Sequence, residues 1–301
     1  MSKIPVIFDT DIGDDIDDTW ALTMMLKSPE LDVKMVLGDY KKPVYRAKIL
    51  AKMLEVAGRT DIPVGVGTGE GDSGNQSEWI GDYDLSSYPG EVHEDGIGGM
   101  IDLIMNSPEP VTLVCTGPVP NIAAALEREP KITRNARFVG MHGSVRMGYG
   151  GNKEISAEWN VRAVPEACRK VFAAEWNVTV TPLDTCGLVH LLGDKYQKVY
   201  ECKEPLAKAL IENYRAWCKA HKNVKDDMVE TRSTTLFDTV AVYLAFCEDL
   251  VEMEEIGIKI TDDGYTVVDE NAKKIRCAME WRDLPAFEDL LVERLIGPIE
   301  R

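Results

Sequence analysis

Short apolar runs rich in valine and isoleucine recur along the chain, with amphipathic segments between them. Their apolar character is continuous rather than alternating, which is typical of strands covered on both faces, as in a mostly parallel sheet. The predicted strands are residues 4–8, 33–37, 62–66, 111–115, 138–141 and 178–182. The predicted helices between them include residues 19–26, 44–56, 122–126 and 165–174. This alternation predicts an α/β fold, a mostly parallel open sheet with helices on both faces.

The C-terminal part of the chain has a different pattern. Two strand-like runs are separated by the turn signal Asp262-Asp263-Gly264, which predicts a β-hairpin. The predicted elements are a helix at 236–246, strands at 256–260 and 265–268, and a final helix at 285–295. No internal repeat or linker interrupts the sequence, so we expect residues 1–301 to form a single domain with a C-terminal hairpin and helix extension.

Two stretches are longer than ordinary connections of about two to six residues. Residues 67–99 are rich in glycine and serine, and residues 144–157 contain the sequence MGYGGN. Loops of this length often form the lid or the walls of a site, so we expect both stretches to border a ligand.

Composition narrows the class of partner. With 34 basic and 51 acidic residues the net charge is −17, so a polyanion would be repelled and no nucleic-acid partner is expected. The seven cysteines are scattered without CxxC spacing, which favours reduced thiols in a cytoplasmic protein. No apolar run approaches the roughly eighteen residues needed to span a bilayer, so we predict a soluble protein without a membrane partner.

Six aspartates lie within ten residues of the segment VIFDTDIGDDIDDTWAL, between the first predicted strand and the first predicted helix. The carboxyl ends of strands in an open α/β sheet border the ligand crevice. Repulsion among these carboxylates would destabilise the loop unless a cation neutralised it, and oxygen ligands select Ca²⁺ or Mg²⁺. Helix capping explains one or two aspartates, but not Asp9 and Asp11 at the strand end.

The segment DTDIGDDIDDTWAL matches the motif DTDxGxDDxxAL in a longer form, with two extra residues before the DD pair. Further blocks follow in order: VHEDGIGG at 92–99, TGPVPNIAAAL at 116–126, GNKEISAEWNV at 151–161, PEAC at 165–168 and FDTVAVYLA at 237–245. In these blocks the chain resembles the inosine-uridine-preferring nucleoside hydrolase family. The resemblance implies Ca²⁺-dependent hydrolysis of the N-glycosidic bond of a small ribosylated substrate, by a homodimer or homotetramer.

The resemblance also implies roles for individual residues. The implied calcium ligands are the carboxylates of Asp11, Asp18 and Asp238 and the backbone carbonyl of Thr116. The implied contacts to the sugar come from Asp17, Asn152, Glu158, Trp159 and Asn160, with Trp159 in place of the usual Phe. The expected reaction is attack on the anomeric carbon by a metal-bound water that Asp11 deprotonates. Asp9 is expected to support the cluster, and Asp14 and Asp15 belong to the insertion.

One position departs from the family pattern. The residue before the late aspartate is Phe237, where well-studied purine-accepting members have a histidine thought to protonate the leaving base. An aromatic ring cannot donate that proton, so another group protonates the base, the base leaves readily as an anion, or the chain hardly catalyses. His93 and His142 are candidates because both lie in segments expected near strand ends, and His93 is included among the substrate-binding residues.

Two other classes of function remain open. The sequence VIFDTD also fits the strand and DxD motif of Mg²⁺-dependent haloacid-dehalogenase-like phosphatases, although Gly13 stands where that class has Thr or Val. With Phe237 in place of an acid, the chain could instead bind a ribosylated ligand without turnover or be a degenerate hydrolase. The complete aspartate set argues against decay, because unused aspartates would repel one another without a cation.

Overall fold

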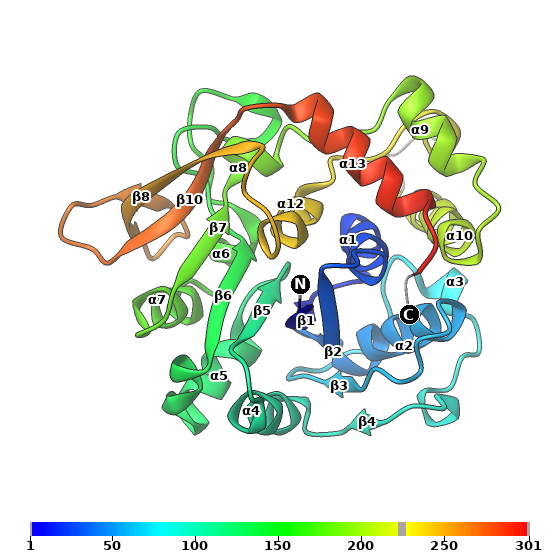
Figure 1. Cartoon of the computed structure of the whole chain (residues 1–301), viewed down its shortest axis with the longest axis horizontal. Coiled ribbons are helices and arrows are strands. Elements are labelled where there is room, and N and C mark those ends of the chain that lie inside the picture. Colours follow the sequence, from blue (N-terminus) through cyan, green and yellow to red (C-terminus); the bar gives the residue numbers. More distant parts are fainter. Residues whose placement is uncertain (1, 222–226, 300–301) are drawn as a thin grey trace.

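The computed structural model describes residues 2–221 and 227–299, and a ten-stranded sheet runs through this part of the chain (Figure 1). The strand order is β4-β3-β2-β1-β5-β6-β7-β10-β8-β9, and every neighbouring pair from β4 to β10 is parallel. The first seven strands are β1 (Ile4–Thr10), β2 (Leu31–Gly38), β3 (Val64–Val66), β4 (Val92–His93), β5 (Val111–Cys115), β6 (Ala136–Met141) and β7 (Val178–Thr181). The predicted mostly parallel α/β sheet is confirmed.

Helices cover both faces of this sheet, which explains the continuous apolar runs. On β1, Val6 and Phe8 belong to one hydrophobic cluster, whereas Ile7 points into a second cluster on the opposite face. The helices whose side chains form the first cluster include α1 (Asp17–Leu26), α2 (Pro43–Val56), α9 (Gly193–Tyr200), α10 (Pro205–Ala220), α12 (Phe237–Leu244) and α13 (Leu284–Ile296). Those that form the second include α4 (Gly96–Asn106), α5 (Pro120–Arg128) and α7 (Pro165–Ala173).

Short helices occupy the remaining connections. They are α3 (Ser77–Ile80), α6 (Trp159–Ala163), α8 (Leu183–Cys186), α11 (Met228–Thr231) and the 3₁₀ turns η1 (Leu85–Ser87), η2 (Pro130–Arg134) and η3 (Tyr149–Gly151). The two long stretches singled out in the sequence therefore contain local structure. The first holds α3, η1 and β4, and the second holds η3. Within the described ranges, no helix has both the length and the apolar character needed to cross a bilayer.

The C-terminal extension contains one strand more than the sequence pattern predicted. The predicted hairpin is present as β8 (Val251–Ile260) and β9 (Thr266–Val268), and the final helix is α13. The additional strand, β10 (Lys274–Trp281), pairs antiparallel with β8 and parallel with β7, so it joins the hairpin to the main sheet. Polar and apolar residues alternate in KIRC, and Ile275 and Cys277 are buried, which is the pattern of a strand with one covered face.

His142, which directly follows β6, is part of the interior rather than of a site. Its ring lies 5.5 Å from the ring of Phe138 and 6.1 Å from that of Phe172, measured between ring centroids. The side chain is buried, and this burial lowers the pKa of His142 to about 3. A neutral imidazole packed between two phenyl rings acts as a core residue, so His142 is no replacement for the missing leaving-group acid.

The burial of His142 makes part of the stability depend on pH. The pKa of a histidine in the unfolded chain is near 6.5. Between pH 6.5 and about 3, His142 is therefore protonated in the unfolded chain but neutral in the folded chain. This contribution to the free energy of unfolding is complete above pH 6.5 and is lost as the pH falls, by about 1.4 kcal/mol per pH unit. When the pH is lowered from 7 to 5, we expect the free energy of unfolding of His142→Phe to fall by about 2 kcal/mol less than that of the unmodified chain. Urea unfolding at both pH values measures this difference, and identical losses would contradict it.

Candidate active site

A cavity of about 430 Å³ lies at the carboxyl ends of β1, β2, β5 and β6. Its size is within the range of about 300–1,000 Å³ that is usual for small-molecule sites. Among the described residues, its lining includes the carboxylates of Asp11, Asp14, Asp15, Asp17, Asp18, Glu158 and Asp238. The aspartates of the N-terminal segment are thus gathered with residues from distant parts of the chain.

Three of these carboxylates converge closely. Asp17 and Asp18 begin α1, Asp238 lies in the first turn of α12, and the two helices pack against each other. One carboxylate oxygen from each lies within 4.8 Å of the others, and all three side chains are buried. Burial, and repulsion from neighbouring aspartates, raise the pKa of each well above its usual value. A cation between them would remove this repulsion.

Asp18 is held in place by two hydroxyl groups. The Thr10 hydroxyl donates to Asp18 Oδ1, and the Thr116 hydroxyl donates to the same oxygen at 2.8 Å. These threonines end β1 and follow β5, so the neighbouring strands orient the carboxylate. Because both hydroxyls use Oδ1, the second oxygen, Oδ2, is the one left for a ligand.

The donor set fits a hard divalent cation. The converging atoms are carboxylate oxygens, and the described residues that line the cavity include no histidine or cysteine, the ligands that Zn²⁺ prefers. Asp11 lines the same cavity, and its charge raises the pKa of both Asp18 and Asp238. Burial raises the pKa of Asp11 itself to about 6, although Arg46 opposes this effect.

Glu158 and Asn160 are fixed by backbone groups. Glu158 caps α6, and its carboxylate accepts hydrogen bonds from the N–H groups of Asn160 at 2.8 Å, Gly143 at 3.0 Å and Val161 at 3.3 Å. The Asn160 amide donates to the carbonyls of Thr116 at 2.7 Å and Met141 at 3.0 Å, which bridges the ends of β5 and β6. Burial raises the pKa of Glu158 to about 7.

Aromatic side chains surround the polar cluster in two edge-to-face pairs. Tyr149 and Phe237 have ring centroids 6.1 Å apart, and Tyr40 and Trp159 have centroids 6.5 Å apart. The Tyr149 hydroxyl accepts a hydrogen bond from the Trp159 N–H at 2.9 Å, which links the two pairs. Tyr149 and Trp159 remain 43% and 46% exposed, and the Arg162 guanidinium lies over the Trp159 ring, 5.3 Å from its centroid.

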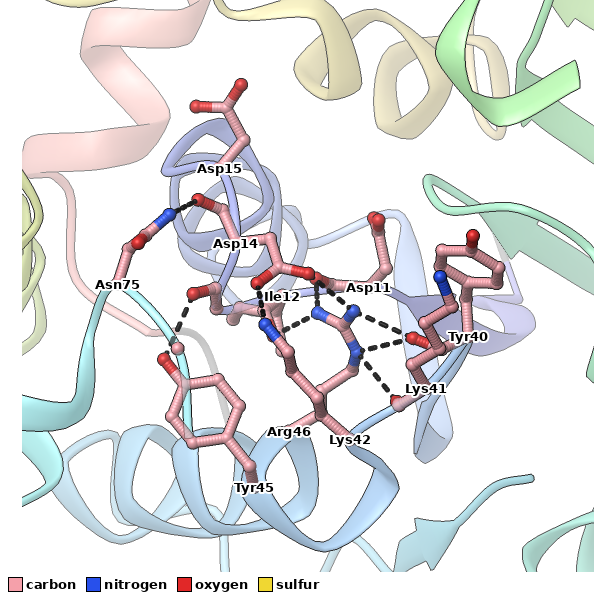
Figure 2. A network of polar contacts seen from close by, with 12 residues as sticks. Asp11, Ile12, Asp14, Asp15, Tyr40, Lys41, Lys42, Tyr45, Arg46 and Asn75 are labelled. Atoms are coloured by element: carbon pink, nitrogen blue, oxygen red, sulfur yellow. Dashed lines mark hydrogen bonds and ion pairs between the residues drawn. The ribbon is translucent and has the colours of Figure 1, made fainter. Parts of the chain in front are cut away.

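A buried arginine holds the insertion that contains Asp14 and Asp15 (Figure 2). The Arg46 guanidinium donates to the carbonyls of Asp11 and, at 2.9 Å, Ile12, and pairs with Asp14 at 2.9 Å. Lys42 also pairs with Asp14, at 2.6 Å. The carboxylate of Asp15 points away from this network (Figure 2). The insertion therefore has one carboxylate that is neutralised by Arg46 and Lys42 and a second, Asp15, that lies outside this network. Asp15 accepts a hydrogen bond from the Ile16 N–H at 2.8 Å, and His221 opposes the rise in its pKa that burial causes.

Asn75, Tyr45 and Trp217 hold the same loop from its other side. Asn75 Nδ2 and Trp217 Nε1 donate to the Asp14 carbonyl at 2.6 and 3.1 Å, and the Tyr45 hydroxyl donates to the Gly13 carbonyl at 3.0 Å. The backbone carbonyls of the insertion thus accept hydrogen bonds from side chains of α2, α10 and the loop that precedes α3.

The turn after β2 is strained. Tyr40, Lys41 and Lys42 have φ angles of 42°, 56° and 43°, a left-handed conformation that costs about 1–2 kcal/mol for a residue other than glycine. In this conformation the carbonyls of Tyr40 and Lys41 accept hydrogen bonds from Arg46, at 2.8 Å and 3.3 Å. The same guanidinium therefore stabilises both the strained turn and the aspartate loop.

The structure separates two predicted site residues from the others. His93 ends β4, which lies at the edge of the sheet, and its ring faces Glu91 at 3.7 Å. Asn152 is exposed, and its side-chain oxygen accepts a hydrogen bond from the Glu154 N–H. Neither lines the cavity, because β4 lies three strands from β1 and Asn152 lies on the outer part of its loop. The predicted residues that do line it are Asp11, Asp17, Asp18, Thr116, Glu158, Trp159, Asn160 and Asp238.

Several cavity residues were missed by the sequence analysis. Lys42, Asn75 and Met141 line the cavity, and Arg46 holds its wall. Met141 ends a predicted strand and Lys42 lies shortly after another, and Asn75 lies in a long loop already expected to border a ligand. Arg46 lies inside a predicted helix, and no local signal distinguishes it from a surface arginine.

A family model and several known proteins match this chain. The family model for "Inosine-uridine preferring nucleoside hydrolase" matches residues 6–289. Similar proteins include a probable uridine nucleosidase 2 of Arabidopsis thaliana, 26% identical over 94% of this chain and 91% of the relative. A pyrimidine-specific ribonucleoside hydrolase RihA of Citrobacter koseri is 28% identical over 97% of this chain and 98% of its own.

Solved structures share the fold. A plant nucleoside hydrolase superposes with a TM-score of 0.81 at 22% identity, covering 99% of this chain and 100% of that one. A purine-preferring ribonucleoside hydrolase from Gardnerella vaginalis gives a TM-score of 0.78 at 23% identity, covering 98% and 99%.

Replacing Arg46 tests whether one side chain holds the wall of the cavity. Lysine keeps the charge but cannot donate to several carbonyls and a carboxylate together. We expect Arg46→Lys to lower the free energy of unfolding by about 3 kcal/mol, because the carbonyls of Asp11, Ile12 and Tyr40 lose their donor at about 1 kcal/mol each. Tyr45→Phe removes one hydrogen bond to the same loop and is expected to cost about 1 kcal/mol. Denaturant unfolding measures both, and an equal loss would show that Arg46 has no special role.

Proposed function

This chain belongs to the inosine-uridine preferring nucleoside hydrolase family, and on that premise we propose that its cavity hydrolyses the N-glycosidic bond of a ribosylated compound with the help of Ca²⁺. The observation that carries the proposal is the convergence of Asp17, Asp18 and Asp238 beside Glu158 and Asn160 in one cavity. Carboxylates and an amide around a small cavity suit a polyhydroxylated sugar, because each can accept or donate a hydrogen bond.

Within this proposal, Asp11, Asp18 and Asp238 and the Thr116 carbonyl would hold the cation. Asp17 belongs to the same cluster of three carboxylates. A ribose hydroxyl bound by Asp17, as the sequence predicts, would therefore lie next to the cation. Oxygen ligands of this kind are those of Ca²⁺, and the bound cation would hold hydroxyl groups and lower the pKa of water.

The chain's own residues supply the rest of the reaction. Asp11, whose burial raises its pKa to about 6, accepts the proton of the attacking water. Glu158 and Asn160, fixed by backbone hydrogen bonds, orient the sugar. The carboxylates around the anomeric carbon stabilise the positive charge that develops on the sugar as the bond to the base breaks.

Family membership excludes one rival reading and weakens another. A haloacid-dehalogenase-like phosphatase is no longer tenable, because the nucleoside hydrolase model spans residues 6–289. The relatives are named as nucleosidases and hydrolases, and the carboxylates that would hold a metal are together in one cavity. A cytoplasmic homodimer or homotetramer stays a prediction.

Calcium binding can be tested apart from activity. We expect Ca²⁺ to raise the melting temperature, because a ligand that binds only the folded chain stabilises it by RT ln(1 + [L]/Kd). Asp18→Asn and Asp238→Asn are expected to abolish most of this shift, whereas Asp102→Asn on the exposed face of α4 leaves it unchanged. Differential scanning fluorimetry with Ca²⁺, Mg²⁺ and a chelator measures the effect. A shift with Mg²⁺ alone would overturn the choice of metal.

The role of Asp11 can be tested on p-nitrophenyl riboside, whose leaving group needs no proton. We expect Asp11→Ala to lower kcat by about 10²–10⁴-fold at saturating Ca²⁺, the usual contribution of a general base. Circular dichroism checks that the variant is folded. A kcat within tenfold of the unmodified enzyme would exclude Asp11 as the proton acceptor, and an unmodified chain without activity would refute hydrolysis.

A further inference from the structure

The described residues around the cavity offer no good proton donor for a leaving base. Phe237 stands next to Asp238, and the described residues that line the cavity include no histidine. The Tyr149 hydroxyl accepts a hydrogen bond from the Trp159 backbone N–H at 2.9 Å, and partial burial and the nearby Glu158 carboxylate raise the pKa of Tyr149 above its usual range, which makes it a poor acid. Lys42 is held in its ion pair with Asp14. A neutral nucleoside, whose base leaves as an anion unless it is protonated, is therefore a poor match for this cavity.

The charge of the cavity points to a cation. Seven carboxylates line it, and Lys42 is the one basic side chain among the described lining residues. Lys42, Arg46 and a divalent metal ion would together offset about four of the seven charges if all were ionised. Asp15 belongs to the remainder that Arg46 and Lys42 do not offset, since its carboxylate points away from both (Figure 2). The group that interacts with Asp15 is His221, which is not among the residues that line the cavity. A positively charged ligand is attracted by such a field.

The aromatic side chains suit the same kind of ligand. Phe237 and the partly exposed rings of Tyr149 and Trp159 line the cavity. The faces of such rings attract cations and stack with flat heteroaromatic rings. Trp159 already makes one such contact, with the Arg162 guanidinium, so Phe237 and Tyr149 are the rings left for a ligand. Phe237, which cannot act as an acid, can thus contact the leaving group as a packing surface.

We propose that the preferred leaving group is a heteroaromatic base that is positively charged at its glycosidic nitrogen, as in an N-ribosylpyridinium. This inference rests on the proposed function and narrows it to one class of substrate. One substrate class then explains all three features. A cationic base needs no acid, the excess of carboxylates attracts it, and the aromatic side chains pack against its ring.

The reaction is balanced without an acid. The bond from the anomeric carbon to the ring nitrogen breaks, and its electron pair neutralises the nitrogen, so the base leaves uncharged. Water forms the new bond to the anomeric carbon, and its proton passes to Asp11 and then to solvent. Positive charge moves from the base to the sugar during this step, so the carboxylates of the cavity stabilise it before and during bond breaking.

Three substrates separate this inference from the proposed function. Nicotinamide riboside has a cationic base, uridine has a neutral base that needs a proton, and p-nitrophenyl riboside needs neither charge nor proton. We expect kcat/KM for nicotinamide riboside to exceed that for uridine by at least about 10²-fold, because a general acid contributes 10²–10⁴-fold where it is needed. Cleavage of p-nitrophenyl riboside with no preference for nicotinamide riboside over uridine would overturn the inference alone. No cleavage of any of the three with Ca²⁺ would overturn the proposed function itself.

One substitution tests the electrostatic part. Asp15→Asn is expected to lower the ratio of kcat/KM for nicotinamide riboside to that for uridine by about fivefold, the effect of about 1 kcal/mol between charges about 4 Å apart in water. Glu109→Gln is the matched control. Glu109 is exposed and precedes β5, so it lies at the amino end of the strands, whereas the cavity lies at their carboxyl ends. An unchanged ratio in Asp15→Asn, or an equal change in Glu109→Gln, would show that the excess charge of the cavity does not select the substrate.

Discussion

The repulsion among buried carboxylates at one end of the sheet is the constraint on which the rest of this site depends. Asp17, Asp18 and Asp238 lie within 4.8 Å of one another in a setting that raises the pKa of each. Such an arrangement persists only where the surrounding structure holds it. The α1–α12 packing and the hydroxyls of Thr10 and Thr116 provide that support. Because a bound cation would remove the repulsion among the three carboxylates, that repulsion favours cation binding.

Support for the insertion is built differently. Arg46 is completely buried, and its guanidinium satisfies carbonyls on both the aspartate loop and the left-handed turn after β2. Its charge is matched by Asp14. The insertion is therefore a rigid part of the cavity wall, and its second aspartate, Asp15, is held at the cavity without being neutralised by this network. The Arg46 network therefore determines both the shape of this cavity wall and the distribution of charge along it.

Much of the fold follows from local pattern, because strands such as β1 and β5 are buried on both faces and so read as unbroken apolar runs. β10 was missed because its alternating residues resemble many exposed segments, and its partners β7 and β8 are known only once the chain is folded. In the site, the motif aspartates and the residues Glu158, Trp159 and Asn160 were found because motifs are local. Arg46, Lys42 and Asn75 act through contacts between distant segments, which a single sequence does not display.

The position of β10 also has a consequence for biogenesis. β7 ends at Thr181, and the strand that covers its free edge is Lys274–Trp281, so almost a third of the chain must be synthesised between them. Until then the growing polypeptide presents an unpaired strand edge, which is a template for unwanted pairing. Asp238 also emerges within this interval, so the parallel sheet is complete only after the last acidic group of the site has been made. Closure of the sheet is therefore a late, long-range event, of the kind that makes folding slow.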